Sequence, residues 1–165
     1  GTGLLDAVAT AAVAKLRAFS PKGLSNLAWA FAALAAEDEG LFRSLSREAL
    51  GKLGAFSMQG LSNLAWALAS LGVEEPVLFE AVVEEAVARL RSESVGQCES
   101  SSTSERSAME SWGAASQQPK AILGLVWAAA FMGRLDELEL LGPARSALAR
   151  FGRSLDTVSL GGAWL

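Results

Sequence analysis

FSPKGLSNLAWAFAAL at residues 19–34 recurs as FSMQGLSNLAWALASL at residues 56–71, and 12 of the 16 letters are identical. Both copies contain an uninterrupted GLSNLAWA core, and equivalent letters lie 37 residues apart. Self-similarity of this length at a fixed spacing is the sequence signature of a repeat protein. The sequence therefore predicts that one structural unit occurs more than once in the chain.

Each copy predicts an α-helix, and we refer to these helices as the A helices. Ser20 and Ser57 suit the N-cap position, where a hydroxyl accepts from a backbone N–H of the first turn. Pro21 suits the first helical position, where its missing N–H costs nothing. Apolar residues recur at helical spacing and predict one buried face in each copy. That face consists of Leu24, Leu27, Phe31 and Leu34 in the first copy and of Leu61, Leu64, Leu68 and Leu71 in the second.

A second helix, the B helix, recurs with the same spacing. Residues 4–18 carry an apolar stripe, and two more stripes follow at intervals of 37 residues. The stripes are Leu5, Val8, Ala12 and Leu16; Phe42, Leu45, Ala49 and Leu53; and Phe79, Val82, Ala86 and Leu90. Because an apolar stripe must be covered, we expect the A helices to pack on the B helices. The A-helix residues expected in this contact are Leu27, Phe31, Leu64 and Leu68, against the stripes that contain Leu45 and Val82.

The segment at residues 92–117, SESVGQCESSSTSERSAMESWGAASQ, interrupts the pattern. It is rich in Ser and Glu and has almost no aliphatic residues, so it cannot bury enough apolar surface to offset the entropy of ordering. We predict a flexible insertion that the fold does not need. A phosphorylation segment and a redox role for Cys98 are functional alternatives to a disordered loop.

The repeat resumes after the insertion. Residues 119–132, PKAILGLVWAAAFM, predict a third A helix in which Trp127 takes the place of Trp66. A helix is expected to restart at Pro143 and to run to about residue 151, and Trp164 is expected in a fourth, truncated A helix. The predicted organisation is one domain, with repeats at residues 1–91, the insertion at 92–117 and continuing repeats at 118–165. We interpret the chain as a fragment of a longer array.

These patterns predict an all-α fold. Helical hairpins of this length cannot bury their stripes alone and must stack on their neighbours. The expected architecture is a right-handed α-solenoid of stacked hairpins with a period of 37 residues. A compact irregular helical bundle is the alternative, and the match of register over successive periods argues against it.

Composition narrows the functional classes. The chain has 165 residues, a net charge of −4, one cysteine and no histidine. A single cysteine excludes an internal disulfide framework, and the lack of histidine removes the usual general base and metal ligand. No phosphate-binding loop or zinc-binding HExxH motif is present, so we expect no enzymatic activity, no cofactor and no metal. Neither DNA nor a membrane is an expected partner, because the charge is negative overall and no apolar run reaches the length of a membrane span.

The letters at residues 23–30 and 60–67 resemble the octotricopeptide repeat, a helical hairpin of similar length found in algal organellar proteins and related to the helical repeats that accompany RAP domains. The signature of that repeat is a Phe-Ser-Pro-like cap and a Leu-x-Asn-Leu-x-Trp-Ala-like helix that ends near Leu-Gly. Residues 122–133 match it in part. The resemblance implies sequence-selective binding of single-stranded RNA in a chloroplast or mitochondrion, for transcript stability, processing or translation.

The face of the A helices opposite the apolar stripe supplies the candidate RNA contacts. Residues 22–34, 59–71 and 120–132 contain two lysines and no acidic residue, so phosphate is not repelled there. Amides and hydroxyls can contact base edges, and tryptophans offer stacking surfaces. The candidates are Lys22, Ser25, Asn26 and Trp29; Gln59, Ser62, Asn63 and Trp66; and Lys120 and Trp127.

Simpler interpretations remain open for the same residues. The tryptophans can pack between adjacent A helices, and polar side chains near a first turn can serve the backbone. The alternative function is a protein-interaction scaffold, because concave faces of helical arrays also dock peptides and partner helices. The acidic turns at residues 37–40 and 72–76 favour that alternative.

Overall fold

The computed structural model describes residues 2–95, 105–135 and 139–155. Over these residues the chain is helical and contains no strand, which confirms the predicted all-α class. The helices are α1 (Thr2–Val13), η1 (Leu16–Ala18), α2 (Pro21–Ala33), α3 (Glu39–Leu50), η2 (Leu53–Ala55), α4 (Met58–Leu71), α5 (Pro76–Val95), α6 (Glu105–Phe131) and α7 (Leu141–Leu155), of which η1 and η2 are short 3-10 helices.

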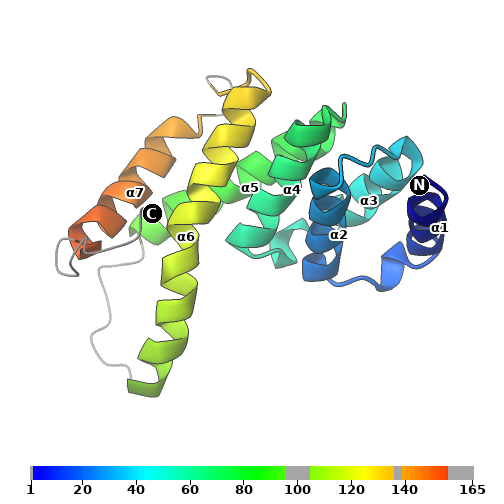
Figure 1. The fold of residues 1–165 in the computed structure, drawn as a ribbon. Helices are drawn as coiled ribbons and strands as arrows, with labels where there is room; N and C mark the ends of the chain where they lie inside the picture. Colours follow the sequence, from blue (N-terminus) through cyan, green and yellow to red (C-terminus); the bar gives the residue numbers. More distant parts are fainter. Residues whose placement is uncertain (1, 96–104, 136–138, 156–165) are drawn as a thin grey trace, which may run out of the picture.

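The helices form two layers. In the first, which we call the A layer, α4 packs between α2 and α6. In the second, the B layer, α1 contacts α3, α3 contacts α5 and α5 contacts α7. Each A-layer helix also packs on the B-layer helix that follows it in sequence, so the chain alternates between the layers (Figure 1).

The predicted helix starts are confirmed in atomic detail. Ser20 Oγ accepts from the Gly23 N–H at 3.1 Å, and Ser57 Oγ accepts from the Gly60 N–H at the same distance. Pro21 occupies the first turn of α2, as predicted. These caps satisfy one of the backbone donors that every helix start leaves unpaired, so they fix where α2 and α4 begin.

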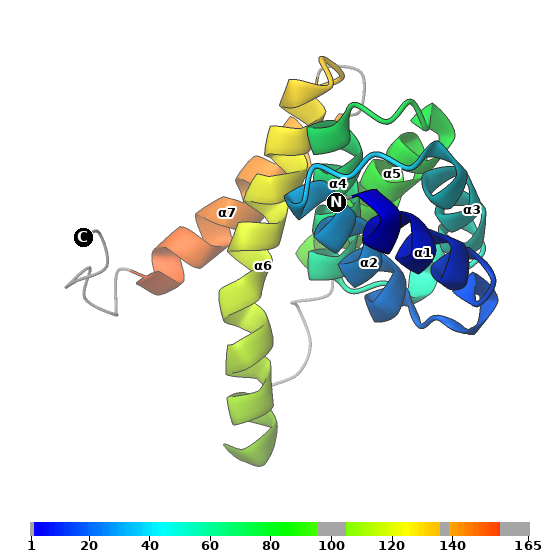
Figure 2. The same cartoon turned by 45° about the vertical axis from the view of Figure 1, so that its right-hand side comes forward.

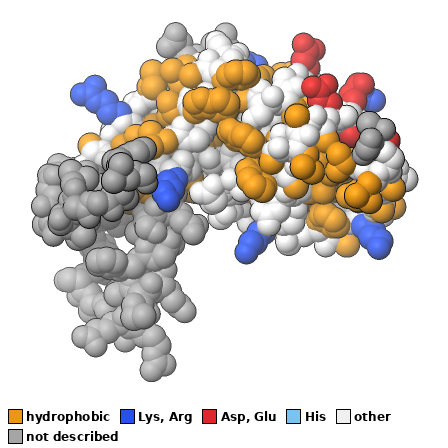
Figure 3. Space-filling view, viewed as in Figure 1, with side chains coloured by type: hydrophobic (Ala, Val, Ile, Leu, Met, Phe, Trp, Pro, Cys, Tyr) orange, Lys and Arg blue, Asp and Glu red, His pale blue; other side chains and the backbone are white. Residues whose placement is uncertain are grey.

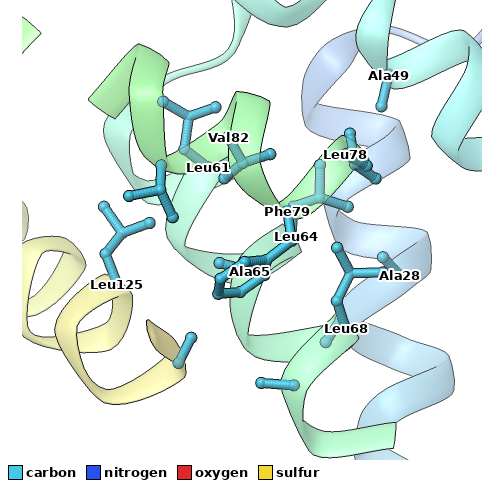
Figure 4. Packing of buried hydrophobic residues seen from close by; sticks show 14 of the residues in the cluster. Ala28, Ala49, Leu61, Leu64, Ala65, Leu68, Leu78, Phe79, Val82 and Leu125 are labelled. Atoms are coloured by element: carbon cyan, nitrogen blue, oxygen red, sulfur yellow. The ribbon is translucent and has the colours of Figure 1, made fainter. Parts of the chain in front are cut away.

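The core lies between the two layers. Leu64 and Leu68 of α4, Leu45 of α3 and Val82 of α5 are fully buried in one hydrophobic cluster, as predicted. Figure 4 shows the side chains of α4 among those of α2 and α5. Burial of an aliphatic side chain of this size stabilises the fold by about 1.5–3 kcal/mol, so this cluster is what holds the layers together.

Two predicted core positions are wrong. Leu34 is 62% exposed, because it caps the end of α2 and the chain already turns away there, with Ala35 in the left-handed region at φ 49°. Val8 is 42% exposed, whereas its repeat equivalents Leu45 and Val82 are fully buried. α1 lies at the edge of the B layer (Figure 1), and no helix of the described residues precedes it to cover Val8.

The segment at residues 92–117 differs from the expected irregular insertion. α5 continues to Val95 and α6 begins at Glu105, so most of the segment is helical. Residues 96–104, with Cys98, lie outside the described residues. The scarcity of aliphatic letters argued against burial, but Ala, Glu, Met, Arg and Gln are good helix formers and can extend an existing helix. Pro119 therefore falls inside α6 instead of at its start.

The remainder of the chain follows the prediction only in part. The N-terminal half of α6 projects beyond the other helices in both views (Figures 1 and 2). α6 ends as expected, with Gly133 at φ 68° just after it, as Gly72 at φ 62° caps α4.

α7 begins two residues before Pro143 and ends beyond the expected limit. Pro143 is tolerated in the first turn, because the backbone N–H groups of a first turn have no intrahelical acceptor and the N–H that proline lacks is not needed there. The expected fourth A helix around Trp164 lies outside the described residues.

One contact that joins successive units was not predicted. Lys52 Nζ donates to the carbonyls of Arg17 and Phe19, at 2.8 and 3.0 Å. Arg89, which lies 37 residues after Lys52, donates to the carbonyls of Gly54, at 3.0 Å, and of Phe56. A cation just after α3 and another within α5 thus bind the carbonyl groups around the preceding 3-10 helix, at positions 37 residues apart.

Candidate functional site

A groove of about 410 Å³ opens between the N-terminal halves of α2 and α4. Its volume lies in the range of sites that bind small organic ligands. The lining residues are Ser20, Pro21, Lys22, Ser25 and Asn26 from the start of α2, Ala55 from η2, and Ser57, Gln59, Gly60 and Asn63 from the start of α4. The repeated cap and the first turns of the repeated helix therefore build both walls.

The groove brings together five of the ten candidate residues. They are Lys22, Ser25, Asn26, Gln59 and Asn63. The sequence placed them on equivalent faces of two helices, and the packing of α2 against α4 makes those faces neighbours. Lys120 is exposed on α6 but does not line the groove.

Ser25 and Ser62 are not on the exposed face, which corrects the sequence analysis. Ser25 is 2% exposed, and its Oγ donates to the carbonyl of Lys22 at 3.1 Å. Ser62 is 4% exposed and lies in the contact between α4 and α6, where a Cβ on Gly124 would be 2.3 Å from its Oγ. Both serines sit where neighbouring A-layer helices approach each other, a position that the periodicity of a single helix cannot reveal.

The tryptophans divide into two groups. Trp29 is 49% exposed and Trp127 is 46% exposed, so neither is wedged between helices. Trp66 is partly buried and packs against the core. The Trp127 ring stacks on Phe131 with ring centroids 5.2 Å apart and an angle of 19° between the planes. Figure 3 shows apolar side chains spread across the face of the molecule that is turned toward the viewer in Figure 1.

Charge is distributed unevenly along the A layer. No carboxylate lines the groove, and Lys22 lies exposed at its edge. The first turns of α2 and α4 add unpaired backbone N–H groups and the positive ends of the helix dipoles. The acidic turns lie at the opposite end of these helices, and Figure 3 shows acidic side chains gathered at the upper right, where α2 ends. An anion therefore meets attraction at the groove and repulsion at the far end of the layer.

One hydrogen bond distinguishes the two walls of the groove. Gln59 Nε2 donates to Asn63 Oδ1 at 2.8 Å. The equivalent pair in α2 is Lys22 and Asn26, and no hydrogen bond joins these two side chains, both of which are exposed. The wall from α4 thus presents a fixed pair of amides, and the wall from α2 presents a cation beside a separate amide.

The sequence did not indicate the remaining lining residues of the groove as ligand contacts. Ser57 was interpreted as a cap only, and Gly60 and Ala55 carry no functional group. These residues are close in sequence to the repeated polar residues, and that proximity is the sequence feature that could have indicated them as part of the groove. Among the described residues, no group of three or more His, Cys, Asp or Glu side chains could hold a metal ion. No described helix is both long and apolar enough to span a bilayer.

Comparison of the chain with protein-family models, with curated proteins and with solved structures found no match.

Proposed function

We propose that this chain is a section of a right-handed α-solenoid with a period of 37 residues, related to the octotricopeptide repeat, and that it binds single-stranded RNA across its A layer. We further propose that it acts in a chloroplast or mitochondrion, in transcript stability, processing or translation, and that it is not an enzyme. The observation that carries the RNA proposal is the groove, which gathers Lys22, Asn26, Gln59 and Asn63 without a carboxylate.

The repeat architecture has support beyond the repeated letters. The Ser20 and Ser57 caps and the contacts of Lys52 and Arg89 recur at the same spacing of 37 residues. Recurring tertiary contacts are expected when each unit packs on its neighbour in the same way, which is the physical basis of a solenoid.

The chemistry of the groove suits a nucleotide of an unpaired strand. Single-stranded RNA exposes base edges that amides can bond and phosphates that lysine and helix starts can attract. The exposed Trp29 and Trp127 lie on the same layer and offer faces on which unpaired bases can stack. The cations are few, so we expect weak affinity with a shallow dependence on salt.

The test is fluorescence anisotropy of the full chain with labelled single-stranded RNA at several salt concentrations. Lys22→Glu should weaken binding to every sequence alike, whereas Asn26→Ala with Asn63→Ala should change base preference more than affinity. Arg47→Glu on the exposed side of α3 is the matched control, because it makes the same charge change away from the groove. Loss of binding with the control and not with Lys22→Glu would defeat the proposal.

A protein-interaction scaffold is the second candidate, and the exposed apolar surface of α6 favours it. Leu123 is 55% exposed and Phe131 is 61% exposed, beside the half-exposed Trp127. Docking of an apolar peptide there would persist as salt rises, whereas RNA binding weakens. Salt dependence of the bound partner therefore separates the two candidates.

A further inference from the structure

We propose that the two walls of the groove have different tasks: Gln59 positions Asn63 so that the α4 wall selects the base, and Lys22 makes the α2 wall a phosphate contact. This inference rests on the proposed binding of single-stranded RNA. Gln59 is a positioning residue in this scheme, and Asn63 is the residue that touches the base.

The hydrogen bond within the α4 wall is the first step of the argument. Because Gln59 Nε2 donates to Asn63 Oδ1 at 2.8 Å, the Asn63 amide nitrogen keeps its donors and the Gln59 amide keeps its acceptor oxygen. The pair therefore offers one donor beside one acceptor. Exchanging the oxygen and nitrogen of both amides leaves the same donor–acceptor combination, so the conclusion does not depend on how the amides are oriented.

A fixed donor–acceptor edge can discriminate among bases. Each base presents its own order of donors and acceptors, and asparagine and glutamine are typical partners of a base edge with a donor beside an acceptor. An amide that rotates freely can adapt to several orders and selects less. The bond from Gln59 thus converts Asn63 from an adaptable contact into a selective one.

The α2 wall lacks this device. Lys22 takes the place of Gln59, and no hydrogen bond fixes the Asn26 amide among the described residues. A lysine side chain carries three donors on a flexible stem, so it attracts phosphate as a point charge without reading the base. The same repeat position therefore carries a positive charge in the first unit, and in the second unit it carries an amide whose hydrogen bond fixes Asn63.

An exchange of the two residues tests the proposal with the full chain. Binding of RNA decamers of adenosine, cytidine or uridine would be measured over a range of salt. Gln59→Lys should reduce the differences among the three decamers by about fivefold, the worth of one hydrogen bond, and steepen the salt slope by about 0.7. Lys22→Gln should do the reverse, with more base preference and a shallower slope.

Gln59→Met separates positioning from charge, because it keeps the length of the side chain and removes the bond to Asn63. It should lower base preference and leave the salt slope unchanged. Thermal unfolding of each variant should match that of the parent, since neither Gln59 nor Lys22 is in the core. If RNA binds and base preference is the same in the parent, Gln59→Lys and Gln59→Met, the division of tasks is overturned while RNA binding stands. If no decamer binds at any salt concentration, both proposals fail.

Discussion

Gly124 of α6 lies so close to Ser62 of α4 that a Cβ on the glycine would be 2.3 Å from the serine Oγ, but 3.7 Å from its Cβ. The serine hydroxyl, and not its Cβ, is therefore what a side chain at position 124 would meet. Alanine in place of Gly124 would force the Ser62 side chain or the helices to move.

Gly124→Ala should destabilise the chain by about 1–3 kcal/mol, since overpacking outweighs the better helix propensity of alanine. Adding Ser62→Ala should restore most of that loss, because only the ordinary Cβ contact remains. Gly142→Ala, at a site with open space, is the control. Urea unfolding measures all three, and a double variant no more stable than Gly124→Ala would show that the hydroxyl is not the obstacle.

Leu64→Ala should cost about 2–5 kcal/mol, because Leu64 is fully buried between the layers and its removal leaves a cavity. Leu123→Ala is the matched control, since Leu123 is 55% exposed on α6. The measurement is the free energy of unfolding in urea. A cost below about 0.5 kcal/mol at Leu64 would mean that the core face of α4 is assigned wrongly.

Ser46→Ala should leave stability unchanged or raise it by about 1 kcal/mol. Ser46 is 3% exposed, and its Oγ has no hydrogen-bond partner, so its burial is not compensated. The repeat equivalents Ala9 and Val83 are apolar and buried. Ser44→Ala, whose hydroxyl donates to the Gly40 carbonyl at 2.8 Å, is the comparison. A melting temperature lowered by Ser46→Ala alone would contradict this expectation.

Lys52→Met and Arg89→Met should each destabilise the chain by about 1–2 kcal/mol, because each leaves the carbonyls around a 3-10 helix without a donor. Lys15, the equivalent residue of the first unit, is exposed. Lys15→Met should therefore be nearly neutral in the same unfolding experiment. Equal effects at all three positions would indicate a general effect of charge and not the carbonyl contacts.

If the chain binds RNA as we propose, Trp127→Ala should weaken that binding by about tenfold, the scale of one lost base–aromatic stack, with a small effect on stability. Trp127 is about half exposed, so few core contacts are lost. Trp66→Ala should instead lower the melting temperature, because Trp66 packs against the core. Anisotropy and thermal unfolding of both variants distinguish the two roles, and an unchanged RNA affinity for Trp127→Ala would exclude base stacking there.

Local features of the fold followed from the sequence because their causes are local. A cap such as Ser20 bonds a backbone group three residues away, and a stripe such as that of Leu64 and Leu68 needs only the period of the helix. The helical part of the 92–117 segment did not follow from the scarcity of aliphatic residues, because a helix can form without burying a stripe when its residues have high helix propensity.

The sequence by itself determined the helices of the two repeated units and the direction in which the polar side chains of each A helix point. Only the tertiary structure decided which of those polar residues share a groove and which are covered by a neighbour. Ser25 and Asn26 are adjacent in sequence, yet one is buried beside the next helix and the other is exposed. The period of a helix specifies the direction of a side chain, whereas burial depends on how closely the neighbouring helix approaches it.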